Sequence, residues 1–205
     1  MSANPFTEDY YERGRELGIS GYSAYRWLPE LTIPMAYHLA TQLPLRSDER
    51  ILDFGAAKGY VVKALRLLGF EASGLDISEY AVNAADAETR PHLTIGSKVT
   101  GDWSWIIAKD VLEHLGHAQL IQTLRQFRAA TRNLFVVVPL GDGQQFVIPD
   151  MEKDVTHIIR EDMGWWCDAI RAAGFERLTH AYRMDGLKEN WTKPYPAGNG
   201  FFIAS

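Results

Sequence analysis

The sequence has almost no cysteine: Cys167 is the only one among 205 residues. It can therefore form no intramolecular disulfide and no metal site built from several thiolates. The sequence also lacks an apolar run long enough to cross a bilayer, and its first residues lack the basic and apolar segments of a secretory signal peptide. These absences favour a soluble protein of a reducing compartment, and we expect the cytoplasm.

An excess of positive charge is also missing. The 21 Lys and Arg residues are outnumbered by 26 Asp and Glu residues, which gives a net charge of −5. Binding to nucleic-acid phosphates relies on clustered basic residues, and the basic residues here are scattered along the chain. We therefore expect neither a nucleic-acid nor a membrane partner. The sequence does not predict an oligomeric state.

What the sequence does contain is a regular alternation of two kinds of segment. Short apolar runs typical of buried strands alternate with amphipathic runs typical of helices. The expected strands are 51–54, 70–76, 93–95, 103–110, 134–139, 175–183 and 200–204, and the expected helices are 31–43, 61–68, 78–85, 120–130 and 161–173. Residues 141–160 and 185–199 are expected to be loops. This order predicts an α/β fold with a doubly wound, mostly parallel sheet, whose last strand returns antiparallel after the long connection.

The first 45 residues differ from the rest in their many aromatic side chains. We expect residues 1–45 to form a helical cap within the same domain, and residues 46–205 to form the ligand-binding domain. Thr7 is expected to cap the first helix, and Gly18 to follow its end. The aromatic side chains either cover a ligand site or pack the cap onto the sheet; they are Phe6, Tyr10, Tyr11, Tyr22, Tyr25, Trp27 and Tyr37.

A glycine-containing loop follows the first expected core strand. Residues 53–59 read Asp-Phe-Gly-Ala-Ala-Lys-Gly, and a helical segment begins directly after them. Gly55 and Gly59 let the backbone approach a ligand closely, because they carry no Cβ. A strand, a tight turn and a helix N-terminus are the arrangement with which α/β proteins hold nucleotide-like ligands.

Three acids end three of the expected strands: Asp53, Asp76 and Asp110. The carboxyl ends of parallel strands open onto one edge of the sheet, where ligands of such folds bind. Asp76 lies 17 residues after Gly59, a spacing at which an acid reaches the hydroxyls of a ribose. The sequence therefore predicts a site for a ribose-containing ligand at this edge.

These motifs resemble those of the class I S-adenosylmethionine (SAM)-dependent methyltransferases. Residues 53–59 are similar to the family's first motif, residues 74–78 (Gly-Leu-Asp-Ile-Ser) to its second, and residues 107–115 (Ile-Ala-Lys-Asp-Val-Leu-Glu-His-Leu) to its fourth-strand motif. The resemblance covers about residues 50–205 and implies a Rossmann-like methyltransferase fold, with residues 46–205 as the SAM-binding domain. It also implies the following SAM-binding residues: Asp53, Gly55, Ala56, Ala57, Gly59, Asp76, Ile77, Asp110 and Val111.

Two features depart from the family's pattern or leave it incomplete. Ala57 stands where the family has its middle glycine, and we expect SAM to bind nonetheless, provided that Ala57 keeps a negative φ. No residue is assigned to the adenine, although Ser97, Asp102 and Trp103 lie nearby in the sequence. Residues 11–14 and 25–31 resemble a subgroup of bacterial and phage methyltransferases of unassigned substrate.

The resemblance implies transfer of a methyl group to a hydroxyl or amine, and this chemistry calls for a base. His157 and His114 are the expected catalytic residues, because imidazole titrates near neutral pH; Asp110 and Glu113 are further candidates. A hydrogen bond of His114 to the sheet edge and an ordinary loop position of His157 are the structural alternatives.

Tyr25, Arg26 and Trp27 are expected to bind the acceptor from the cap. We expect a small polar metabolite, with a sugar or a nucleotide-sugar as candidates. A structural alternative for Arg26 is an ion pair with Glu30, four residues further along a helix.

Other functions stay open at this point. The acceptor could be a macromolecule, or the chain could bind SAM without catalysis. A nicotinamide-dependent oxidoreductase is less favoured, because no tyrosine has a lysine four residues later. No metal is expected: His114 and His117 beside Glu113 could form a ligand cluster, but a solvated turn is the preferred interpretation.

Overall fold

The computed structural model describes residues 4–205, so the first three residues of the expected cap lie outside the described part. These residues form one sheet of seven strands in the order β3-β2-β1-β4-β5-β7-β6. The strands are β1 (Arg50–Phe54), β2 (Glu71–Asp76), β3 (Leu93–Ile95), β4 (Trp103–Lys109), β5 (Thr131–Pro139), β6 (Leu178–Ala181) and β7 (Asn199–Ala204).

The pairing of the strands confirms the predicted doubly wound sheet. β1 lies parallel to β2 and β4, β2 to β3, and β4 to β5. The last strand, β7, is antiparallel to both of its neighbours, β5 and β6. The reversal of strand order between β1 and β4 opens a crevice at the carboxyl ends of these strands, which is where such sheets bind ligands.

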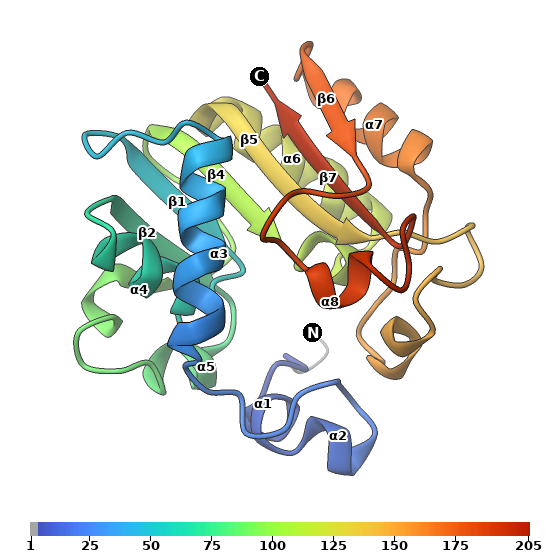
Figure 1. Cartoon of the computed structure of the whole chain (residues 1–205), viewed down its shortest axis with the longest axis horizontal. Helices are drawn as coiled ribbons and strands as arrows, with labels where there is room; N and C mark the ends of the chain where they lie inside the picture. The colour runs from blue at the N-terminus through green and yellow to red at the C-terminus, as the bar shows by residue number, and fades with distance from the viewer. Residues whose placement is uncertain (1–3) are drawn as a thin grey trace.

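Helices cover both faces of the sheet, as Figure 1 shows. They are α3 (Pro29–Gln42), α4 (Tyr60–Leu67), α5 (Glu79–Asn83), α6 (His117–Ala130) and α7 (Met163–Ala172). Alternate residues of each strand face opposite sides. Ile51 is buried against α3 and α4, whereas Leu52 is buried with α6 and α7. Burial on both faces explains why the central strands read as continuous apolar runs in the sequence.

The N-terminal segment begins with two short helices, α1 (Glu8–Glu12) and α2 (Gly14–Leu17). Both lie beyond the sheet edge toward which the parallel strands point (Figure 1). Thr7 occupies the N-cap position of α1, as predicted, but its side chain makes no capping hydrogen bond. Gly18 ends α2 in a left-handed conformation, as predicted.

The connections contain more helix than the sequence predicted. Short helical turns occur at η1 (Arg90–His92), η2 (Leu112–His114), η3 (Pro149–Lys153) and α8 (Glu189–Thr192). The expected strand 175–183 is shorter in the structure, because β6 pairs with β7 over four residues only. Within residues 4–205, no helix is both long enough and apolar enough to cross a membrane.

Candidate active site

A cavity of about 520 Å³ opens at the carboxyl ends of β1, β2 and β4. One side, which we call the sheet wall, is built by the loops that follow these strands; its residues are Gly55, Ala57, Asp76, Ile77, Asp110 and Val111. The other side, which we call the cap wall, comes from the N-terminal segment and the loop after η3; its residues are Phe6, Tyr10, Tyr11, Tyr22, Val155, Thr156 and Ile158. His114 lies between the two walls.

Six of the nine residues expected to bind SAM form the sheet wall. Asp53, Ala56 and Gly59 do not line the cavity but stand behind it: Asp53 and Ala56 are buried, and Gly59 is the N-cap residue of α4. Of the three residues near the unassigned adenine position, Ser97 lines the cavity, whereas Asp102 and Trp103 do not.

Gly55 shows why the sheet wall needs a residue without a side chain. Its φ is +79°, and a Cβ on it would lie 2.3 Å from Cγ2 of Val111. Its N–H donates to the carbonyl of Leu75 at 2.8 Å, which holds the loop against the end of β2. A larger residue at this position would therefore clash with Val111, which also lines the cavity.

Ala57 corrects one expectation. Its φ is +49° rather than negative, a conformation that costs an L-residue about 1–2 kcal/mol. The Ala57 N–H donates to Oδ2 of Asp76 at 2.7 Å, and its methyl group packs against the aromatic cluster around Tyr10 and Tyr11. These contacts explain how the strained conformation is held.

Asp76 and Asp53 are both buried acids at strand ends. Asp76 accepts hydrogen bonds from the N–H groups of Ala57 and Ser78, each at 2.7 Å. Burial raises the pKa of Asp76, and the two amide donors oppose this shift. Burial also raises the pKa of Asp53 to about 7, which the nearby Lys109 ammonium counteracts only in part.

Asp110 has a different electrostatic environment. It accepts from Nζ of Lys109 at 2.6 Å and from Nζ of Lys188 at 2.5 Å. Burial alone would raise its pKa, but the two ammonium groups hold the pKa well below its ordinary value. Asp110 therefore stays ionised, in a left-handed conformation with φ +54°.

The cap wall is fixed by hydrogen bonds between distant segments. The Tyr10 hydroxyl donates to Oδ2 of Asp154 at 2.7 Å. Burial raises the pKa of Tyr10, so it stays a neutral donor at physiological pH. The buried Lys58 ammonium bridges the glycine loop to α1, because it donates to Glu12 at 2.5 Å and to the carbonyl of Tyr25 at 2.8 Å.

The three residues expected to bind the acceptor do not line the cavity. Tyr25 packs against Tyr60, with ring centroids 5.0 Å apart, and Trp27 contacts Tyr60 as well. Arg26 is exposed. The alternative ion pair of Arg26 with Glu30 is absent from the ion pairs of residues 4–205. The two interpretations of the aromatic segment each hold for part of it, because Tyr10, Tyr11 and Tyr22 cover the cavity while Trp27 packs on a helix.

The structure brings together the two histidines expected to be catalytic. The rings of His114 and His157 lie 4.6 Å apart, and only His114 lines the cavity. Burial and the neighbouring His157 lower the pKa of His114 to about 4, and burial also lowers that of His157. Both are neutral imidazoles at pH 7, which is the form that accepts a proton or binds a cation.

The expectation of a solvated turn at Glu113 is wrong, because this side chain is only 1% exposed. Burial, together with the charge of Asp110, raises its pKa to about 8. His117, the neighbour expected from local spacing, points elsewhere and lies 3.5 Å from Glu161.

Sequence reasoning missed Lys58, Lys188 and Tyr10 as site residues. Lys58 carried a usable signal, because a lysine inside a glycine loop between buried elements must find a partner. Lys188 and Tyr10 gave none, since their partners Asp110 and Asp154 lie 78 and 144 residues away.

The residues of this site fit SAM. The cavity has the size of a small-molecule site, and the missing side chain of Gly55 makes room for Val111, which also lines the cavity. Two oxygens of a carboxylate offer about four acceptor positions, so Asp76 can still accept ribose hydroxyls beside its two amide donors. Asp110 also lines the cavity, but its charge is already balanced by Lys109 and Lys188.

Comparison with known proteins supports this fit. The sequence pattern of a family described as a methyltransferase domain matches residues 34–189. No curated protein sequence matches the chain. Solved methyltransferase structures share its fold at 13–16% sequence identity.

Three of these structures illustrate the range. A chain in the complex of the Haloferax volcanii Trm112 methyltransferase activator with a methyltransferase has a TM-score of 0.68 and 16% identity, over 86% of this chain and 90% of that one. A SAM-dependent methyltransferase from Archaeoglobus fulgidus has a TM-score of 0.64 and 14% identity, over 82% and 91%. A Haemonchus contortus N-methyltransferase, in complex with phosphomonomethylethanolamine and S-adenosylhomocysteine, has a TM-score of 0.61 and 13% identity, over 83% and 51%.

The family match extends from α3 to α8 and includes all three strand-end acids and the glycine loop. The match favours SAM rather than a nicotinamide as the cofactor. It also favours an enzyme rather than a protein that binds SAM without catalysis. The chain belongs to the methyltransferase domain family and is a class I SAM-dependent methyltransferase.

Proposed function

We propose that this enzyme methylates a hydroxyl or amine of a small polar metabolite. The observation that carries the proposal is the cap wall, which closes the cavity opposite the sheet wall with Tyr10, Tyr11 and Tyr22. A cavity of about 520 Å³ that also takes SAM leaves space for a small acceptor group. Tyrosine offers an apolar ring and a polar hydroxyl, which suits a hydroxyl-rich acceptor such as a sugar or a nucleotide-sugar.

The sheet wall has the binding role in this proposal. Asp76 holds the ribose, the backbone around Gly55 and Ala57 approaches the methionine moiety, and Ile77 lies beside the adenine. SAM supplies an activated methyl group on a sulfonium with a good leaving group. The protein's own contribution is therefore alignment, exclusion of water and removal of a proton from the acceptor.

His114 and His157 are the groups that we propose promote loss of this proton. The acceptor oxygen or nitrogen forms a bond to the methyl carbon, the carbon–sulfur bond breaks, and sulfur keeps the electron pair. A neutral imidazole can assist directly as a base or indirectly as the ligand of a cation. Tyr25, Arg26 and Trp27 have a remaining role in this proposal only if the acceptor extends beyond the cavity toward the outside of the cap.

The test is a transfer assay with methyl-labelled SAM over a panel of sugars, nucleotide-sugars and small amines, with total tRNA and denatured protein as macromolecular acceptors. We expect label in a small hydroxyl or amine compound and its loss in Asp76→Ala. Label in RNA or protein alone would overturn the proposal. The matched control is Asp185→Ala, a change of the same kind at a residue that does not line the cavity.

A further inference from the structure

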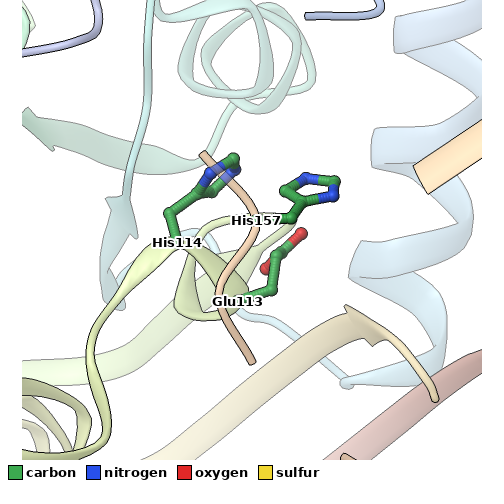
Figure 2. Close-up of side chains that lie close together, drawn as sticks. All are labelled: Glu113, His114 and His157. Carbon is green, nitrogen blue, oxygen red and sulfur yellow. The ribbon is translucent and has the colours of Figure 1, made fainter. Parts of the chain in front are cut away.

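Three potential ligand side chains meet beside the cavity. Glu113 and His114 come from η2, and His157 comes from the loop after η3 (Figure 2). One potential ligand atom of each side chain lies within 4.8 Å of the other two. Two ligand atoms on one tetrahedral cation lie roughly 3.4 Å apart, so movements of about an ångström would bring these three atoms onto a single ion.

The Glu113 carboxylate is buried, and one of its oxygens lacks a hydrogen-bond partner within residues 4–205. The side chain is 1% exposed, and this oxygen is Oε2. A buried carboxylate oxygen without a partner loses its hydration and gains nothing in return. A bound cation would supply the missing interaction.

Within residues 4–205, each histidine has one ring nitrogen that makes no hydrogen bond. Nδ1 of His157 lies 2.8 Å from the carbonyl of Met151. Because a carbonyl can only accept, Nδ1 carries the proton, and Nε2 keeps its lone pair. The nearest carboxylate oxygen to this Nε2 in the described ion pairs, Oδ2 of Asp154, lies 3.9 Å away, beyond hydrogen-bond distance.

The second histidine is fixed in the same way by a different partner. Nδ1 of His114 lies 2.7 Å from Oγ1 of Thr156, whose hydroxyl donates to Asp154 at 2.5 Å. Nδ1–H therefore donates to Thr156, and Nε2 is again free. Histidine ligands of metals are commonly oriented through their other nitrogen by a carbonyl or by a carboxylate relay.

The neighbouring acids are already occupied. Asp110 is paired with Lys109 and Lys188, and Asp154 accepts from Tyr10 and Thr156. Neither is free to complete the hydrogen bonding of Glu113, and neither is needed as a ligand.

We propose that Glu113, His114 and His157 bind one divalent transition-metal cation at the edge of the active-site cavity. Two imidazole ligands favour a borderline cation such as Zn²⁺ over Mg²⁺ or Ca²⁺, and the carboxylate also suits Mn²⁺. Three protein ligands leave further coordination positions open, as in catalytic rather than structural metal sites. Since His114 lines the cavity, the open positions face the acceptor.

The role of the cation rests on the proposed function. An acceptor hydroxyl coordinated to the cation has a lowered pKa, loses its proton to solvent and attacks the methyl carbon. The carbon–oxygen bond forms, the carbon–sulfur bond breaks, and S-adenosylhomocysteine leaves with the electron pair. With the cation bound, the two Nε2 atoms are ligands rather than bases, and acceptors with oxygen donors are preferred to simple amines.

The test titrates Zn²⁺, Mn²⁺ and Mg²⁺ into full-length protein stripped with a chelator, by calorimetry. Glu113→Gln and His157→Gln remove ligands, and His117→Gln is the matched control because His117 is exposed and paired with Glu161. We expect one equivalent of Zn²⁺ or Mn²⁺ in the wild type and the control, and affinities lower by more than about 100-fold in both ligand variants. S-adenosylhomocysteine binding, unchanged in all four proteins, shows that each one is folded.

Equal Zn²⁺ and Mn²⁺ affinity in the wild type and both ligand variants would overturn the site, as would no binding by the wild type. Substitution with Co²⁺ gives an independent readout. The visible absorption bands of a four- or five-coordinate ion should appear in the wild type and should be absent from both ligand variants. Transfer activity tests the role separately. Activity lost with the chelator and restored by the cation supports it, and activity unaffected by the chelator overturns the role while the binding site stands. Metal binding without transfer to any small acceptor would instead contradict the proposed function.

Discussion

The sheet wall and the cap wall of one cavity are built by different means. The sheet wall is made of strand ends, glycine and backbone N–H groups held by the sheet, although a distant residue, Lys188, also holds Asp110. The cap wall is made of aromatic side chains held by bonds that span most of the chain, such as that between Tyr10 and Asp154. In the proposed function, the sheet wall binds the cofactor common to the family and the cap wall faces the acceptor.

Asp53 and Asp110, two acids at the sheet edge, differ in their pKa. Substitution of Asp53 has the largest expected effect on stability. The pKa of Asp53 is raised by burial to about 7, against about 3.9 in an unfolded chain. The folded state therefore binds more protons between pH 4 and 7, and the free energy of unfolding falls as pH rises through this window. Asp53→Asn should raise the free energy of unfolding at pH 8 by up to about 4 kcal/mol.

Urea denaturation at pH 5 and pH 8 checks this prediction. The loss of stability from pH 5 to pH 8 should be smaller in the variant than in the wild type by the contribution of Asp53, whereas Glu113, whose pKa is also raised, contributes in both proteins. Equal pH dependence in the two proteins would show that Asp53 is ionised in the folded state across the whole range.

Replacing the glycine of the sheet wall should weaken cofactor binding. Gly55→Ala brings a Cβ against Val111 in a conformation that alanine rarely adopts, and we expect S-adenosylhomocysteine to bind about 100-fold more weakly, or about 2.7 kcal/mol. Calorimetry measures the affinity. The double variant Gly55→Ala with Val111→Ala removes the clash and should recover part of the loss; no recovery would place the cost in the backbone alone.

The cap wall should respond in stability rather than in cofactor binding. Tyr10→Phe leaves Oδ2 of Asp154 without its buried donor, which should lower the free energy of unfolding by about 2 kcal/mol. Tyr22→Phe is the control, since Tyr22 lies in the same aromatic cluster and its hydroxyl makes no hydrogen bond within residues 4–205. Chemical denaturation measures the stability of both variants, and titration with S-adenosylhomocysteine measures their cofactor affinity. A cofactor affinity reduced more than threefold by Tyr10→Phe would contradict the distinction between the two walls.

Ala57 joins the two walls and gives the smallest expected effect. Ala57→Gly relieves a positive φ but loses the methyl contact with the aromatic cluster. The balance should raise the free energy of unfolding by about 1 kcal/mol, read as a shift of the denaturation midpoint. A lower midpoint would mean that the methyl contact with the cap outweighs the strain.

The same contrast explains what could be predicted from the sequence. Asp53, Asp76 and Asp110 could be placed on one edge because each ends a parallel strand, and strand ends follow from local patterns. Their different protonation could not be predicted, because Lys188 reaches Asp110 from 78 residues away.

The histidines show the same limit. Local spacing paired His114 with His117, whereas the fold pairs it with His157. The loop returns there because the N–H groups of Ile158 and Ile159 both donate to the carbonyl of Glu113, at 2.8 and 3.0 Å. The sequence near His114 does not predict that contact. The cap shows the same limit, because the sequence favours Tyr25 and Trp27 as acceptor residues, whereas Tyr10 and Tyr22 line the cavity.

The central claim is that the sheet wall binds SAM and directs its methyl group toward the cap wall. A crystal structure with S-adenosylhomocysteine tests it most directly. We expect the ribose hydroxyls within about 3 Å of the Asp76 carboxylate, the homocysteine moiety against Gly55, and the sulfur facing the space between His114 and Tyr22. A ribose away from Asp76, or a sulfur facing solvent away from the cap wall, would contradict the account.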